Sequence, residues 1–262
     1  MPNMNKWTSI VAAAGMAAGM AWGATTIIGP NGEETVVYAA GEEPVKTPSP
    51  VVREGDTVHF GSVDLDLATK AVTCTGWVNQ ARGIVEVLAC GEEGKVHESI
   101  LVLSVNPLDL QAALLLAGNK GGEPMPGFGV GPARGSPVDL WVEWTDRESG
   151  EPQKARAETF VLDVERGAAM EEGPWVFTGS VVKDGEFKAL SEETLLATYW
   201  DPYAIINNPY ASGGNDDILF ANPETVPPVG TPVRFTIVPA ASDNPKLATE
   251  GVGGMGRTRF GF

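Results

Sequence analysis

The sequence predicts an α+β fold: a mostly antiparallel β-sheet with one well-defined helix at about residues 107–117 and long Gly/Pro-rich loops. Glycine and proline are abundant, with 32 and 20 copies in 262 residues, which favours short elements joined by turns. Runs such as DTVHFGSVDLDL and VDLWVEWTD alternate apolar and polar residues, as half-buried strands do. A clear helical pattern occurs in NPLDLQAALLLAG.

The first 23 residues have the pattern of a secretory signal peptide. Lys6 supplies a positive charge, residues 10–20 form a short apolar run, and Ala21 and Gly23 suit cleavage after Gly23. The run is short for a membrane span, and an uncleaved anchor is the alternative that stays open. We therefore expect an exported protein, secreted or in the periplasm or cell envelope, that does not span the membrane after cleavage.

Composition divides the rest of the chain into three parts. Residues 24–50 hold two strand-like runs around the turn sequence GPNG, which predicts a hairpin, followed by the proline-rich linker GEEPVKTPSP. Residues 51–239 carry the alternating patterns and are the predicted globular domain. Residues 240–262 are glycine-rich, with Arg257 and Arg259, and predict a flexible tail.

The first strands of the domain are predicted to bring the two cysteines together. A hairpin with its loop at residues 81–83 pairs Cys74 with Cys90 across the ladder. In an exported chain a cross-strand disulfide is one interpretation, and two neighbouring core thiols are the other. Two cysteines cannot supply a four-cysteine zinc site or an iron–sulfur cluster.

The sequence GEEG at residues 91–94 predicts the next hairpin turn. If all four residues are in the turn, Glu86 pairs with Ser99, and His97 lies on the same sheet face. A shift of one residue would exchange the faces and bring Glu98 beside Glu86. This constellation therefore depends on the register of the turn.

The helix and the later strands follow from local signals. Asn106 suits the N-cap, Pro107 the first helical position and Gly118 the end of the helix. A long Gly/Pro-rich loop is predicted at residues 118–137 and a polar one at 207–232. Strands are predicted at residues 138–146 and 154–164, which form a hairpin, and at 174–182, 193–200 and 233–239.

Four segments, in the order GKVHESILV, NPLDLQAALLLAG, WVFTGS and VPPVGTPVRFTIVP, resemble the YdjY-type domain of exported bacterial proteins. The resemblance covers about residues 50–239. Its most specific part is HES at residues 97–99, followed by the leucine-rich helix. The family has no established molecular function. The resemblance therefore implies which residues form the domain, and it implies no mechanism.

Two chemical hypotheses concern the predicted sheet face. Glu86, His97 and Ser99 are candidate catalytic residues of a hydrolase-type enzyme, because a carboxylate can orient an imidazole that activates a hydroxyl. The donor atoms of Glu86, His97, Glu98 and Cys90 suit a divalent cation, although neither HExxH nor CxxC is present. We predict no resident cofactor, and a divalent cation is the alternative.

The function that the sequence favours is a non-catalytic binding or structural module. Aromatic rings beside oxygen-bearing side chains suit a saccharide or protein partner in the cell envelope. The candidate ligand-binding residues are Glu98, Trp200, Tyr203, Tyr210, Asp216 and Asp217. The net charge of −16 argues against nucleic acid, because a phosphate backbone would be repelled.

Overall fold

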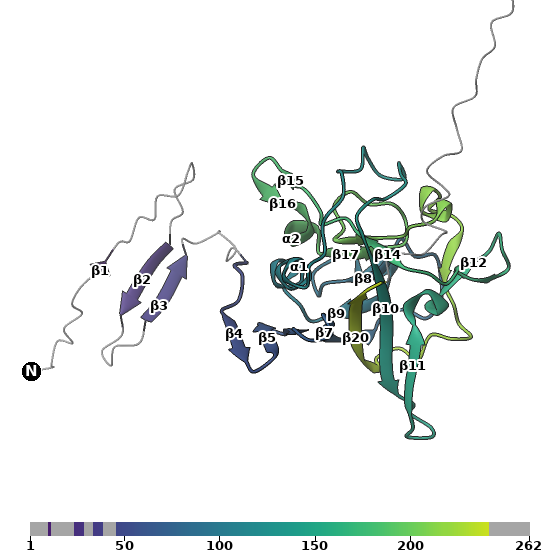
Figure 1. Cartoon of the computed structure of the whole chain (residues 1–262), viewed down its shortest axis with the longest axis horizontal. Coiled ribbons are helices and arrows are strands. Elements are labelled where there is room, and N and C mark those ends of the chain that lie inside the picture. The colour runs from purple at the N-terminus through teal and green to yellow at the C-terminus, as the bar shows by residue number, and fades with distance from the viewer. Residues whose placement is uncertain (1–9, 12–23, 29–33, 39–45, 241–262) are drawn as a thin grey trace, which may run out of the picture. The chain divides into compact units, whose positions relative to one another are not determined.

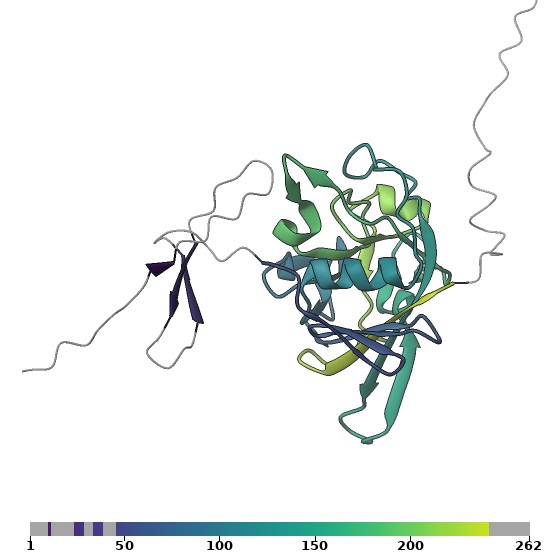
Figure 2. The same cartoon turned by 60° about the vertical axis from the view of Figure 1, so that its left-hand side comes forward.

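The computed structural model describes residues 10–11, 24–28, 34–38 and 46–240 (Figure 1, Figure 2). The chain divides into two units, Met1–Thr47 and Pro48–Phe262. In the first unit, β2 (Ala24–Ile28) pairs antiparallel with both β1 (Ile10–Val11) and β3 (Glu34–Tyr38). β2 and β3 occupy the two runs for which the sequence predicts a hairpin. The remainder of the predicted signal peptide and the tail after residue 240 lie outside the described residues.

The second unit is mostly β, and 8 of its strands close into a barrel. Their order is β10-β14-β18-β17-β8-β9-β7-β20, and β20 pairs with β10 to complete the ring. The pairs β8–β9 and β17–β18 are parallel, and the other neighbours in the ring are antiparallel. The bounds are β7 (Val72–Val78), β8 (Val87–Cys90), β9 (Ser99–Leu103), β10 (Ser136–Thr145), β14 (Trp175–Phe177), β17 (Thr194–Ala197), β18 (Ile206–Asn207) and β20 (Pro232–Pro239).

Further strands extend or flank the barrel. β6, β5 and β4 continue the sheet beyond β7, and β11 continues it beyond β10. The bounds of these and the remaining strands are β4 (Val51–Glu54), β5 (Thr57–Phe60), β6 (Val63–Asp66), β11 (Pro152–Arg156), β12 (Val161–Asp163), β13 (Ala168–Ala169), β15 (Val182–Lys183), β16 (Glu186–Phe187) and β19 (Leu219–Ala221). The helices are α1 (Pro107–Leu116) and α2 (Lys188–Glu192), with single 3-10 turns η1 (Val96–Glu98), η2 (Ala157–Phe160) and η3 (Ala211–Gly214).

Helix α1 forms where its capping residues predict it. Asn106 accepts a hydrogen bond from the Leu108 amide at 2.9 Å, and Pro107 occupies the first turn. Leu110 and Leu114 are fully buried, and the helix contacts β5, β6 and β7. Among the described residues, no helix combines the length and the apolar character that a membrane span requires.

The two sides of the barrel differ in burial. Every residue of β8, β9 and β17 is buried, so both faces of these strands are covered. β10 and β20 instead bury alternate residues over most of their length, so one face packs on the core and the other is outside. The largest fully buried side chains include those of Trp175, Phe160, Phe177 and Phe235.

The predicted α+β class is wrong, because the fold is a mostly β closed barrel with only 13% helix. The predicted antiparallel sheet with one helix did not include the closure of the strands into a barrel. Closure depends on β20, which lies between β7 and β10 although all three are far apart in the sequence. Alternation shows that a segment is a strand, but it does not show which strands it joins.

The predicted pairing of Cys74 with Cys90 is also wrong. β7 lies beside β9 and β20, with Cys74 opposite Phe235, whereas Cys90 of β8 pairs with Val102 of β9. β8 is buried at every position, as expected for a strand that is covered on both faces. Both thiols are buried and free. Burial raises the pKa of Cys74 to about 12 and that of Cys90 to about 11, so both stay protonated at neutral pH.

Candidate functional site

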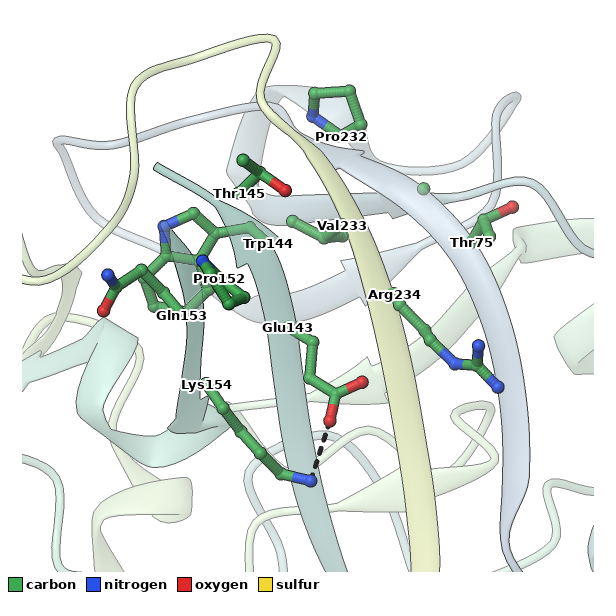
Figure 3. Close-up of a pocket in the computed structure, with 11 residues that line it drawn as sticks. Thr75, Glu143, Trp144, Thr145, Pro152, Gln153, Lys154, Pro232, Val233 and Arg234 are labelled. Carbon is green, nitrogen blue, oxygen red and sulfur yellow. Dashed lines mark ion pairs between the residues drawn. The ribbon is translucent and has the colours of Figure 1, made fainter. Parts of the chain in front are cut away.

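An open groove with a volume of about 560 Å³ crosses the outer face of β11, β10, β20 and β7 (Figure 3). These strands are distant in the sequence but adjacent in the sheet. The groove is lined by Thr75, Gly76, Glu143, Trp144, Thr145, Pro152, Gln153, Lys154, Pro232, Val233 and Arg234.

A row of four polar side chains runs across the groove. Glu143 of β10 is the direct partner of Lys154 on one side and of Arg234 on the other, and Arg234 is the partner of Thr75. Direct partners project from the same sheet face, at a strand spacing of about 4.8 Å. Lys154, Glu143, Arg234 and Thr75 therefore form one continuous line, which we call the cross-strand row.

Two members of the cross-strand row neutralise each other. Lys154 Nζ lies 2.8 Å from Glu143 Oε1, and the two side chains are 53% and 35% exposed. A pair this exposed contributes about 0–1 kcal/mol to stability. Its main effect is on the charge of the groove. Because Glu143 pairs with Lys154, Arg234 is the basic side chain of the groove lining that has no carboxylate partner among the described residues.

Arg234 is exposed, and its guanidinium makes no hydrogen bond or ion pair within the described residues. Figure 3 shows that it points away from Glu143 and toward β7. Beside it lies a second hollow of about 80 Å³, lined by Ser62, Asp64, Thr73, Cys74, Thr75 and Arg234. The Asp64 carboxylate is already engaged, since its Oδ1 lies 2.7 Å from His59 Nδ1.

Trp141 continues the outward face of β10 beyond Glu143. Lys154 Nζ and Arg156 Cζ lie 5.2 and 5.3 Å from the centre of the indole ring, so two cations flank it. Trp144 projects to the opposite side of β10, where its ring packs edge-on against Phe160 at 5.6 Å. Both indoles are therefore held by protein contacts, and Trp144 also lines the groove.

Arg156 is fixed by the fold. Its guanidinium donates to Asp139 Oδ1 at 2.8 Å, to Glu158 Oε1 at 2.7 Å and to the Gly173 carbonyl at 3.0 Å. Glu158 is fully buried, and burial raises its pKa, although hydrogen bonds from Arg156 and the Gly173 amide oppose this shift. Arg156 is thus the partner of a buried carboxyl rather than a group free for a ligand.

The structure does not assemble the predicted catalytic residues. Ser99 is fully buried, and its hydroxyl donates to the Lys95 carbonyl at 2.7 Å. The His97 side chain lies on η1, is 76% exposed, and places Nε2 3.7 Å from Glu98 Oε2. Glu86 Oε2 lies 4.0 Å from Lys95 Nζ. The hydrogen-bonded chain of carboxylate, imidazole and hydroxyl is therefore not formed.

The predicted register fails because β8 and β9 are parallel, with Val87 beside Ser99. The connection at residues 91–98 is held by Glu193, a residue far along the chain. The Glu193 carbonyl accepts from the Gly91 amide at 2.9 Å, and its Oε2 accepts from the Glu93 amide at 2.7 Å. A Cβ at Gly91 would lie 2.3 Å from Glu193 Oε2, so a larger residue there would displace the Glu193 carboxylate. GEEG is a clamped loop and not a hairpin turn.

Lys95 is the centre of the charged groups in this region. Its Nζ lies 3.3 Å from Glu98 Oε1 and 5.9 Å from the centre of the Phe128 ring. Burial by itself would lower the pKa of Lys95, but the carboxylates of Glu98, Asp201 and Glu86 raise it overall. Among the described residues, no group of three or more His, Cys, Asp and Glu is arranged to hold a metal ion.

The predicted ligand-binding aromatic residues serve mostly in packing. Trp200 is 9% exposed and donates to the Asn208 carbonyl at 2.8 Å. Tyr210 packs against the main core, and Tyr203 meets the edge of Phe128 at 5.2 Å. The predicted acidic residues of the same loop, Asp216 and Asp217, are exposed. These residues do not line the groove.

The sequence interpretation missed Trp141, Glu143, Lys154 and Arg234. It did predict the hairpin that contains the first three, and β10 and β11 confirm that hairpin. The predicted extent of its second strand, 154–164, is wrong, because β11 ends at Arg156 and the 3-10 turn η2 follows. The alternation of β10 would have placed Trp141 and Glu143 on its outer face. The sequence could not place Arg234 beside these residues, because no local sequence pattern shows that β20 pairs with β10.

Comparison with known proteins gives one match. The family model of the YdjY domain matches residues 63–238, which include every residue that lines the groove. No curated protein and no solved structure matches the chain.

Proposed function

The chain belongs to the YdjY domain family, which has no assigned function, and from this premise we propose that it is an exported, non-catalytic binding module that holds a saccharide chain in the groove. The observation that carries the proposal is the cross-strand row beside Trp141. The exported location rests on the N-terminal pattern of charge, apolar run and small residues.

The dimensions of the groove suit a ligand. Its volume of about 560 Å³ is within the range of about 300–1,000 Å³ typical of ligand sites. The groove is open rather than enclosed, which favours an extended chain over an engulfed small molecule. Its lining contains no His, Cys or Ser, and Glu143 is neutralised by Lys154. These features support binding rather than nucleophilic catalysis.

The position of the groove favours recognition through side chains. β10 and β20 are each paired on both edges, so their backbone groups are used within the sheet. An extended peptide binds best by adding to a free strand edge. The hydroxyl, amide, carboxylate and ammonium groups of Thr145, Gln153, Glu143 and Lys154 instead match sugar hydroxyls, which both donate and accept. The Trp141 indole, on the outward face beside the row, can stack on the C–H faces of sugar rings.

The test is a titration of the isotope-labelled full chain, followed by amide chemical shifts. The probes are cellohexaose, chitohexaose, a hyaluronan hexasaccharide and a decapeptide of Gly, Ser and Ala. We expect at least one saccharide to shift amides of β10, β11 and β20. Lys154→Ala should weaken that binding several-fold, and Lys120→Ala, at an exposed lysine outside the groove, should leave it unchanged. Shifts caused by the peptide alone, or by none of the probes, would overturn the proposal.

A further inference from the structure

We propose that Arg234 is an anion subsite of the groove, and that the saccharide it holds is a uronate-containing chain whose carboxylate binds the guanidinium. This inference rests on the proposed function and names its ligand class. The cation itself is the first argument. The other basic groups at this face are engaged, Lys154 by Glu143 and Arg156 by Asp139 and Glu158, whereas Arg234 has no partner within the described residues.

The direction of the Arg234 side chain is the second argument. Glu143 is its direct neighbour on β10, yet the Glu143 carboxylate turns to Lys154 and the guanidinium turns to β7 (Figure 3). The fold therefore keeps a cation beside a carboxylate without pairing them. A guanidinium offers five N–H donors in a planar fork, which matches the two oxygens of a carboxylate.

The surroundings of Arg234 provide further donors. Thr75 is its direct partner on β7, and Thr73 also lines the adjoining hollow of about 80 Å³. Threonine hydroxyls can donate to a carboxylate oxygen or to the neighbouring sugar hydroxyls. Asp64 is the one acidic residue in the hollow, and its Oδ1 is held by His59 at 2.7 Å. A ligand carboxylate therefore fits best on the groove side of Arg234, next to Thr75.

The charge of the whole chain limits the ligand further. The net charge is −16, so a densely charged polyanion would be repelled as it approaches. The groove has a single cation to offer, which suits isolated carboxylates separated by neutral sugars. An alternating chain of uronate and neutral hexosamine has this pattern.

The experiment compares two ligands that differ only in the anionic group. Calorimetry of the full chain is done with a hyaluronan hexasaccharide and with the same hexasaccharide after reduction of its carboxylates to primary alcohols. We expect the native form to bind at least about tenfold more tightly, because a hydrogen-bonded ion pair is lost on reduction. Arg234→Gln should lower the affinity for the native form to that for the reduced form. Arg82→Gln, which removes an exposed arginine outside the groove, is the matched control and should keep the difference.

The outcomes separate the two proposals. Equal affinity for the native and reduced forms, or an Arg234→Gln variant that binds like the wild type, would overturn the anion subsite while the saccharide groove stands. Absence of binding by both forms would overturn the anion subsite, and absence of binding by cellohexaose and chitohexaose as well would overturn both proposals. A heparin hexasaccharide completes the test: tighter binding than hyaluronan would contradict the preference for isolated carboxylates.

Discussion

The covered side of the barrel, made of β17, β8 and β9, and the open side, made of β11, β10, β20 and β7, use polar side chains in different ways. On the covered side every strand residue is buried, and polar side chains there bond to backbone carbonyls, although the buried Thr194 hydroxyl has no hydrogen-bond partner among the described residues. Ser99 caps the Lys95 carbonyl, and Asn79 donates to the Ser99 carbonyl at 2.8 Å. On the open side the outward residues of β10 and β20 project from a completed sheet.

This difference explains why residues with familiar catalytic chemistry are not the best guide to the site. Ser99 and Glu98 are occupied by the fold, and His97 lies exposed on a turn. Arg234 has ordinary chemistry but finds no partner at the surface among the residues that the structure describes. A side chain that the fold does not use is available to a ligand, and such side chains are found on the open side.

The largest difference should appear when one residue from each side is truncated. Leu101 of β9 is fully buried, and Thr75 of β7 is exposed on the groove. We expect Leu101→Ala to lower the free energy of unfolding by about 2–5 kcal/mol, because it leaves a cavity in a covered strand. Thr75→Ala should change it by no more than about 0.5 kcal/mol. Urea unfolding measures both, and similar losses would remove the distinction between the two sides.

Arg156 should be an exception on the open side. Its side chain is 17% exposed, but it compensates the fully buried Glu158. Arg156→Met should lower the free energy of unfolding by about 2–3 kcal/mol, because it leaves a buried carboxyl without its partner. The second change Glu158→Gln should recover part of this loss in urea unfolding. If Arg156→Met alone is as stable as the wild type, Arg156 does not stabilise the fold and is no exception on the open side.

The parts of the fold that were predicted correctly are those with local signals. Asn106, Pro107 and Gly118 bound α1, and their capping chemistry acts within one or two turns of the chain. The hairpin of β10 and β11 was predicted because a short turn joins two alternating runs. In both cases the interacting groups lie close together in the sequence.

The parts that failed depend on distant residues. Glu193 holds the loop that joins the parallel strands β8 and β9, and β20 closes the barrel between β7 and β10. The same long-range pairing brings Arg234 beside Glu143, so the groove could not be assembled from one sequence. Alternation supplied the face of each strand but not its neighbours.

The smallest expected effect concerns the charge of Asp201, just after β17. Asp201 is 4% exposed, and its Oδ1 accepts from the Tyr203 amide at 2.7 Å. Burial raises the pKa of Asp201 above its ordinary value, so the folded state binds the proton more tightly than the unfolded state does. The stabilisation is present at low pH and is lost as pH rises from the ordinary pKa through the raised one.

Asp201→Asn keeps an acceptor for the Tyr203 amide and removes the charge. Its free energy of unfolding relative to wild type should therefore increase as pH rises from the ordinary pKa of an aspartate through the raised one, by about 1.4 kcal/mol for each unit of pKa shift. The free energy of unfolding of Asp201→Ala should depend on pH in the same way. It should be lower than that of Asp201→Asn by about 1–2 kcal/mol, because the Tyr203 amide loses its acceptor. Urea unfolding at a series of pH values measures all three proteins. A flat or falling difference for Asp201→Asn would mean that the covered side tolerates this charge as well as the open side does.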